Sequence, residues 1–204
     1  MRLLARTAVF VLGLFVLPAL AQTLSGPVTA PAYPRVALET SAGRIVIELY
    51  PDKAPNTVAN FISYVKDGHY NGTVFHRVIA DLLVQGGAFT PDLQQKPERR
   101  PIINESDNGL SNLRGTIAAA RRPSEKDSAT AQFFINTIDN RQFDFSSDAN
   151  TLTAGYCVFG RVVEGVDVID KIRIVATAAR SPFSSDVPIS PIVIERAVTL
   201  EVIP

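Results

Sequence analysis

A chain of 204 residues is long enough for one full-sized hydrophobic core. Its 20 Lys and Arg residues balance 20 Asp and Glu residues, so the formal net charge is zero. This balance argues against general nucleic-acid or membrane-surface binding, which requires a basic excess. Cys157 is the only cysteine, so no internal disulfide can form, and its apolar neighbours favour a buried core residue over a reactive thiol.

Residues 1–21 have the pattern of a secretory signal peptide. Two arginines precede an apolar run from Ala8 to Leu17, Pro18 breaks that run, and the small-x-small sequence at 19–21 suits a cleavage site. The apolar run is short for a bilayer span. We therefore expect cleavage before Gln22 and no stable membrane insertion afterwards. Residues 22–34 contain three prolines and indicate a flexible leader.

The domain is expected to begin at residue 35 with a β-hairpin. Apolar and polar residues alternate in "RVALET" (35–40) and again in "RIVIELY" (44–50), with "SAG" as the turn between them. The next stretch has the period of an amphipathic helix. Pro55 suits its first turn and Gly68 its end, and one apolar face would carry Val58, Phe61, Ile62 and Val65.

Short strands dominate the remaining chain. We expect them in "TVFHRV", "LLVQGG", "GTIAAA", "AQFFIN" and "YCVFGRV", followed by a short helix in "EGVDVIDKI" and one or two strands in "PIVIERAVTLEVI". Strand alternation places Phe133 and Phe134 on opposite faces, one toward the core and one toward a pocket. Many short strands and two helices without β-α-β alternation predict a closed antiparallel barrel with helices at its ends.

Most common catalytic devices are missing from the sequence. The two histidines, His69 and His76, have no cluster of cysteines or carboxylates near them, so a metal site is not expected. His76 is interpreted as a hydrogen-bonded structural histidine. No G-x-S-x-G elbow or glycine-rich phosphate loop occurs either. We expect no cofactor, and a hydrolase is a distant alternative.

Arg77 stands out in "FHRVIADLLVQGG", because large apolar residues surround it. Such a site suits a reaction without proton transfer, and rotation about an X-Pro amide is one. Its barrier of about 18–20 kcal/mol reflects C–N resonance, and a fixed donor beside an apolar pocket would stabilise the twisted amide. A structural ion pair is the alternative role for an isolated arginine.

The motifs "FHRVIADLLVQGGAFT", "SATAQFFIN" and "YCVFGRVVEGVDVIDKI" resemble the cyclophilins, which are peptidyl-prolyl cis-trans isomerases. The resemblance covers residues 35–203. "NESDNGLSNLRGTIAAAR" and the signal-like start resemble the periplasmic bacterial subtype in particular. The resemblance to the cyclophilins implies a mainly β fold: a closed eight-stranded antiparallel barrel capped by two α-helices.

The resemblance also implies residue roles. Arg77 matches the catalytic donor, and Gln85 matches a glutamine that binds the substrate backbone and helps to position that arginine. The implied substrate-binding residues are Leu82, Leu83, Ala120, Arg121, Gln132, Phe134, Phe143 and Tyr156.

Several positions depart from the family pattern. Ala80-Asp81 replaces Pro-Gly, and Leu82 and Leu83 replace phenylalanine and methionine. Gln142 stands where a tryptophan important for cyclosporin is common, so we expect weak cyclosporin binding.

The resemblance thus implies a periplasmic, monomeric isomerase. It would act on proline-containing segments of unfolded exported proteins and would bind no nucleic acid. The alternative is a cyclophilin-like module that binds proline peptides, or acts as a chaperone, with weak or no catalysis.

Overall fold

The computed structural model describes residues 33–201. The predicted signal peptide and most of the predicted leader, residues 1–32, lie outside the described residues. The strands are β1 (Arg35–Thr40), β2 (Gly43–Leu49), β3 (Thr73–Ile79), β4 (Leu83–Gly86), β5 (Thr116–Ala119), β6 (Phe133–Asn136), β7 (Val158–Glu164), β8 (Thr177–Arg180), β9 (Phe183–Pro188) and β10 (Val193–Leu200). The helices are α1 (Pro55–Lys66), α2 (Val166–Arg173) and the single 3-10 turn η1 (Arg141–Phe143).

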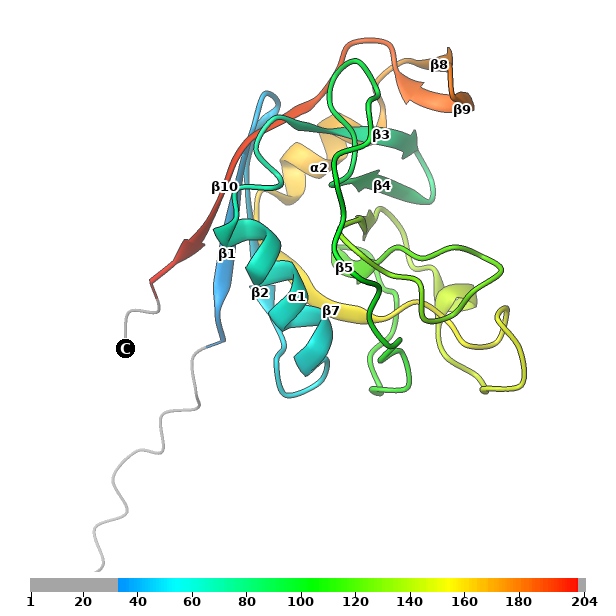
Figure 1. Ribbon diagram of the computed structural model, residues 1–204. Helices are drawn as coiled ribbons and strands as arrows, with labels where there is room; N and C mark the ends of the chain where they lie inside the picture. The colour runs from blue at the N-terminus through cyan, green and yellow to red at the C-terminus, as the bar shows by residue number, and fades with distance from the viewer. Residues whose placement is uncertain (1–32, 202–204) are drawn as a thin grey trace, which may run out of the picture. The chain divides into compact units, whose positions relative to one another are not determined.

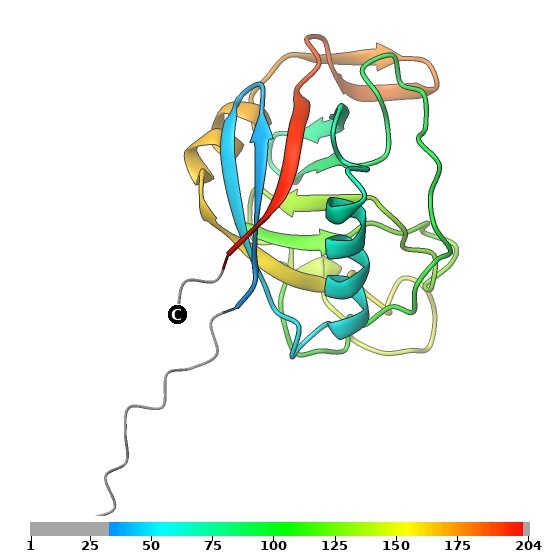
Figure 2. The ribbon, with the colours of Figure 1, turned by 60° about the vertical axis from the view of Figure 1, so that its left-hand side comes forward.

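Eight strands close into a barrel in the order β1-β10-β3-β4-β6-β5-β7-β2, and every neighbouring pair is antiparallel. Figures 1 and 2 show this barrel with α1 and α2 packed against it. The predicted closed eight-stranded barrel with two helices is confirmed. Among the described residues, no helix has the length and apolarity needed to cross a membrane.

One large apolar core joins the barrel to both helices. Val58, Phe61 and Val65 of α1 and Ile169 and Ile172 of α2 belong to the same buried cluster as the inward residues of the strands. Proline at the start of α1 needs no intrahelical N–H partner there, so it begins the helix without cost. The predicted apolar faces of the two helices therefore close the barrel.

A β-bulge in β3 decides which side chains face outward. Phe75 is opposite Gly86 and Arg77 is opposite Gln85, so His76 is an extra residue without a partner in β4. Phe75 and Val78 consequently both point into the core, while His76 and Arg77 lie on the other side of the strand. Gly86 permits this packing, because a Cβ there would lie 2.9 Å from Cδ1 of Phe75.

The β8–β9 hairpin was not predicted, and it forms a separate two-stranded sheet beside β3 (Figure 1). Val187 of this hairpin packs with Val74 of β3 and with Leu93. The strand expected from Tyr156 begins at Val158. The final apolar segment, predicted as one or two strands, forms the single strand β10.

Candidate active site

A groove of about 550 Å³ opens on the outer face of β3, β4, β5 and β6. All ten residues predicted for the site line it, and four further residues complete its wall: His76, Phe89, Pro123 and Phe183. The groove therefore brings together residues from widely separated segments of the chain.

Strand alternation sends the predicted residues into this groove. In β4, Leu83 and Gln85 line the groove, whereas Val84 between them is fully buried in the main core. In β6, Phe133 joins the main core and Phe134 joins a second apolar cluster at the groove. The predicted division of the two phenylalanines is confirmed, because successive side chains of a strand point to opposite faces.

Three aromatic rings form the apolar wall. The ring of Phe134 lies 5.8 Å from that of Phe143 and 5.5 Å from that of Tyr156, both nearly edge to face. Phe143 and Tyr156 are 5.2 Å apart. Leu83, only 4% exposed, packs into the same cluster, and Leu82 lies at its margin. This cluster forms an apolar surface against which a small apolar ring can pack.

Arg121 lines the groove beside the aromatic cluster. Its guanidinium lies 4.5 Å from the centre of the Tyr156 ring, and its Nε and Nη2 atoms donate to the carbonyl oxygens of Gly155 and Thr151. Because these donors are engaged, the side chain holds Tyr156 in place rather than standing free for substrate.

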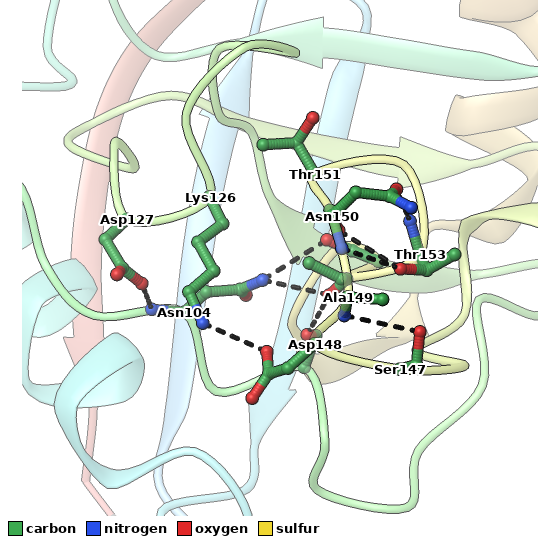
Figure 3. A network of polar contacts seen from close by, with 12 residues as sticks. Asn104, Lys126, Asp127, Ser147, Asp148, Ala149, Asn150, Thr151 and Thr153 are labelled. Carbon is green, nitrogen blue, oxygen red and sulfur yellow. Dashed lines mark hydrogen bonds and ion pairs between the residues drawn. The ribbon is translucent and has the colours of Figure 1, made fainter.

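The loop that carries Thr151 is itself braced by polar contacts (Figure 3). Asn104 donates from Nδ2 to the carbonyl of Ala154 over 3.0 Å, and Lys126 pairs with Asp148 at 3.0 Å. Within the loop, Oδ1 of Asn150 accepts bonds from the backbone N–H groups of residues 152 and 153. These contacts fix the carbonyl groups to which Arg121 donates.

Arg77 and Gln85 face each other across β3 and β4. The expected contact between their side chains is replaced by others: Gln85 donates from Nε2 to Oε1 of Gln132 over 3.0 Å. Arg77 instead forms an ion pair with Asp186 of β9, at 3.7 Å from Nε to Oδ2. The arginine remains 41% exposed and therefore accessible from the groove.

Among the groove residues missed by the sequence, Phe183 comes from the β8–β9 hairpin and contacts two of the others. The ring of Phe183 lies 5.3 Å from His76 and 5.1 Å from Phe89. Burial, assisted by the charge of Arg77, lowers the pKa of His76 to about 4, so its imidazole is neutral at physiological pH. The prediction that His76 is hydrogen-bonded is corrected in part, because its Nδ1 has no partner within residues 33–201.

The altered turn before β4 is held by new contacts. Arg173 of α2 donates from Nη1 to the carbonyl of Ala80 and to Oδ1 of Asp81, at 3.2 and 3.0 Å. The carbonyl of Leu82 accepts bonds from the side chain of Asn140 and the backbone of Thr137. These contacts hold the turn between β3 and β4 in place beside the groove.

Other features lie away from the groove. Cys157 is buried in the main core, as predicted, and burial raises the pKa of its thiol to about 12. Across residues 33–201, no group of three or more His, Cys, Asp and Glu side chains is arranged to hold a metal ion.

Comparisons with known proteins identify the family of this chain. Residues 35–199 match the family model described as cyclophilin type peptidyl-prolyl cis-trans isomerase/CLD. Peptidyl-prolyl cis-trans isomerase cyp18 of Streptomyces antibioticus is 55% identical over 79% of this chain and 96% of its own. Peptidyl-prolyl cis-trans isomerase B of Escherichia coli K12 is 49% identical over 81% of this chain and 99% of its own.

The fold matches solved structures as well. A cyclophilin type peptidyl-prolyl cis-trans isomerase of Cryptosporidium parvum aligns with a TM-score of 0.69 and 23% identity, over 83% of this chain and 98% of that chain. A second structure of it, in the presence of the dipeptide Ala-Pro, gives a TM-score of 0.68. On the strength of the family match and the close relatives, the chain belongs to the cyclophilin-type peptidyl-prolyl cis-trans isomerases.

Proposed function

We propose that this isomerase acts on X-Pro bonds of exported proteins in the periplasm and that Arg77 is its catalytic donor. One observation carries the catalytic part: Arg77 and the aromatic cluster of Phe134, Phe143 and Tyr156 line the same groove. A proline ring can therefore be buried while its preceding amide remains within reach of a fixed cation.

The chemistry requires only differential binding. As the amide twists, resonance is lost and electron density returns to the nitrogen of the prolyl bond. A guanidinium that donates to this nitrogen stabilises the twisted amide more than the planar one, and so lowers the barrier. No proton needs to be exchanged, which fits a groove whose only histidine, His76, is neutral at physiological pH.

The remaining groove residues take supporting roles in this proposal. Leu83, Phe134 and Phe143 hold the proline ring, with Leu82 and Tyr156 at the edge of the pocket. Gln85 and Gln132 offer side-chain amides to the substrate backbone, and Ala120 and Arg121 offer their main chain. The Cryptosporidium structure was obtained in the presence of Ala-Pro, and a dipeptide of this kind is the minimal ligand that we expect here.

A periplasmic location is supported by residues 1–21, with their basic start, apolar run and small-x-small end. The domain would then act as residues 35–204 after a leader at 22–34. We expect a monomer, because one chain supplies all ten proposed groove residues. Fractionation of the source bacterium, with mass spectrometry of the mature N-terminus, tests the location. A cytoplasmic protein that retains residues 1–21 would contradict it.

The catalytic role is tested by a protease-free isomerisation assay on an X-Pro peptide. Arg77→Ala is expected to lower kcat/KM about 100-fold, at the low end for loss of a preorganised donor. Arg114→Ala is the matched control, because Arg114 is an arginine of similar exposure that pairs with Asp170 away from the groove. Equal activity of Arg77→Ala and Arg114→Ala would reject Arg77 as the donor.

A further inference from the structure

We propose that Asp186, on the β8–β9 hairpin, is the positioning residue for Arg77. The inference rests on the proposed role of Arg77 and adds a partner from a segment that lies outside the barrel. Asp186 does not line the groove and acts only through the arginine.

The carboxylate of Asp186 lies on the Nε side of the Arg77 guanidinium. The closest contact runs from Nε of Arg77 to Oδ2 of Asp186, at 3.7 Å. Asp186 is the only carboxylate within ion-pair distance of Arg77 in the described part of the chain. An arginine presents donors at Nε and at both Nη atoms. A carboxylate on the Nε side leaves the terminal N–H groups available to a substrate in the groove that Arg77 lines.

Within residues 33–201, no other side chain forms an ion pair with Arg77. Gln85, the register partner of Arg77, uses its Nε2 to bond Gln132. An arginine that is 41% exposed on a long flexible stem would otherwise sample many rotamers. A partner that restricts these rotamers raises the fraction of time that the donor is in place.

Packing of the β8–β9 hairpin against the barrel holds the Asp186 carboxylate beside Arg77. The ring of Phe183 packs on His76 and Phe89, and Val187 is buried against Val74. These two anchors flank Asp186 on both sides along β9. The pairing of β8 with β9 is irregular between them, since Ala178 faces Val187 but Arg180 faces Phe183. A β-bulge of this kind redirects a side chain.

The backbone of Asp186 also takes an uncommon conformation. Its φ is +66°, in the left-handed region that favours glycine. Non-glycine residues in this region are uncommon and concentrate where the surrounding structure has a use for them. Aspartate tolerates this region better than most non-glycine residues, and here its side chain pairs with Arg77.

Three substitutions separate the carboxylate from the backbone. Asp186→Gly and Asp186→Ala both remove the carboxylate, but glycine suits the left-handed conformation and alanine does not. Asp186→Asn keeps an acceptor oxygen and tolerates the same φ. Glu39→Gln is the control, because it weakens a pair of similar geometry, Arg44 Nε to Glu39 Oε1 at 3.6 Å, between residues that do not line the groove. The protease-free assay and thermal unfolding are measured for each purified protein.

We expect kcat to fall about 10-fold in both the glycine and the alanine variant, as for a displaced catalytic group, with KM nearly unchanged. The glycine variant should be at least as thermostable as the alanine variant. The asparagine variant should lose activity to a similar extent, because the 3.7 Å contact is an ion pair and asparagine carries no charge. In NMR spectra, the Arg77 Nε–H resonance should broaden or exchange faster in the glycine variant, while β3 amide resonances stay in place.

Wild-type kcat in Asp186→Gly, alongside an inactive Arg77→Ala, would overturn the positioning role and leave the proposed donor intact. Loss in Asp186→Ala that Asp186→Gly restores would also overturn it, because the backbone would then be the cause. If Arg77→Ala itself retained full activity, the proposed catalytic role would fail first, and the two results can be told apart.

Discussion

Gln85 donates a hydrogen bond from Nε2 to Oε1 of Gln132 over 3.0 Å. The bond links β4 to the residue that precedes β6, and both side chains line the groove. Gln132 also accepts a backbone bond from Ala120 through its carbonyl. The two glutamines therefore act as one polar unit opposite the aromatic cluster.

This pairing predicts non-additive kinetics. Gln85→Ala should lower kcat/KM about 10-fold, as expected for one lost hydrogen bond to the substrate. Gln132→Ala should have a smaller effect, because it frees the amide of Gln85 without removing it. The loss of transition-state stabilisation in the double variant should be smaller than the sum of the losses in the two single variants, since the residues share one network. Strict additivity in this cycle would show that the glutamines act independently.

The two phenylalanines of β6 provide a matched pair for the apolar pocket. Phe133 and Phe134 are almost equally buried, at 1% and 2% exposure, but belong to different clusters. Replacing either with leucine should lower the free energy of unfolding by about 1–2 kcal/mol. Only Phe134→Leu should also reduce kcat/KM, because only that ring faces the groove. Equal losses of activity in both variants would point to general destabilisation instead.

The barrel and the groove residues could be predicted from the sequence because both follow from short local patterns, hydrophobic periodicity for the barrel and ordered motifs for the groove. Alternation in residues 35–50 predicts β1 and β2, and the helical period predicts the buried face of α1. The ten groove residues follow from the ordered motifs that resemble the cyclophilins, and four of them, Arg77, Leu83, Gln85 and Phe134, lie on strands. Their placement in one groove agrees with these motifs, while their individual roles stay predictions.

The β8–β9 hairpin had no such signal. Its first strand is exposed at every position and reads "TAAR", and its second contains two serines and an aspartate. Asp186 reaches Arg77 only through long-range packing of Phe183 and Val187. The new partner of Gln85 was missed for a related reason, because register alone does not specify which amide accepts its hydrogen bond.

Cyclosporin should bind this isomerase weakly. Gln142, where a tryptophan is common, does not line the groove and donates from Nε2 to Oδ1 of Asn140 over 3.2 Å. Gln142→Trp should strengthen inhibition about 10-fold or more, since a large aromatic surface is added beside the pocket. Competition in the isomerisation assay measures both proteins. Tight, nanomolar inhibition of the wild type would contradict the expectation.

Stability should fall as the pH drops from about 6.5 toward 4. Burial lowers the pKa of His76 from 6.5 to about 4, so in this range the unfolded chain binds a proton that the folded protein does not. The stabilisation is fully present above pH 6.5, and its loss amounts to about 3 kcal/mol near pH 4.

Urea unfolding between pH 4 and pH 7 measures this effect. His76→Phe keeps an aromatic ring beside Phe89 and Phe183 and should remove most of the pH dependence. His69, whose pKa burial also lowers, should account for part of what remains. An unchanged profile in His76→Phe would assign the effect to other groups.

The central claim is that Arg77 binds the twisted amide in preference to the planar one. The most direct measurement combines the catalytic rate on an X-Pro peptide with the peptide's Kd, both by NMR, for the wild type and Arg77→Ala. The account predicts that kcat/KM falls about 100-fold while Kd changes by less than about threefold. A loss of binding as large as the loss of rate would contradict it, because Arg77 would then hold ground state and transition state equally.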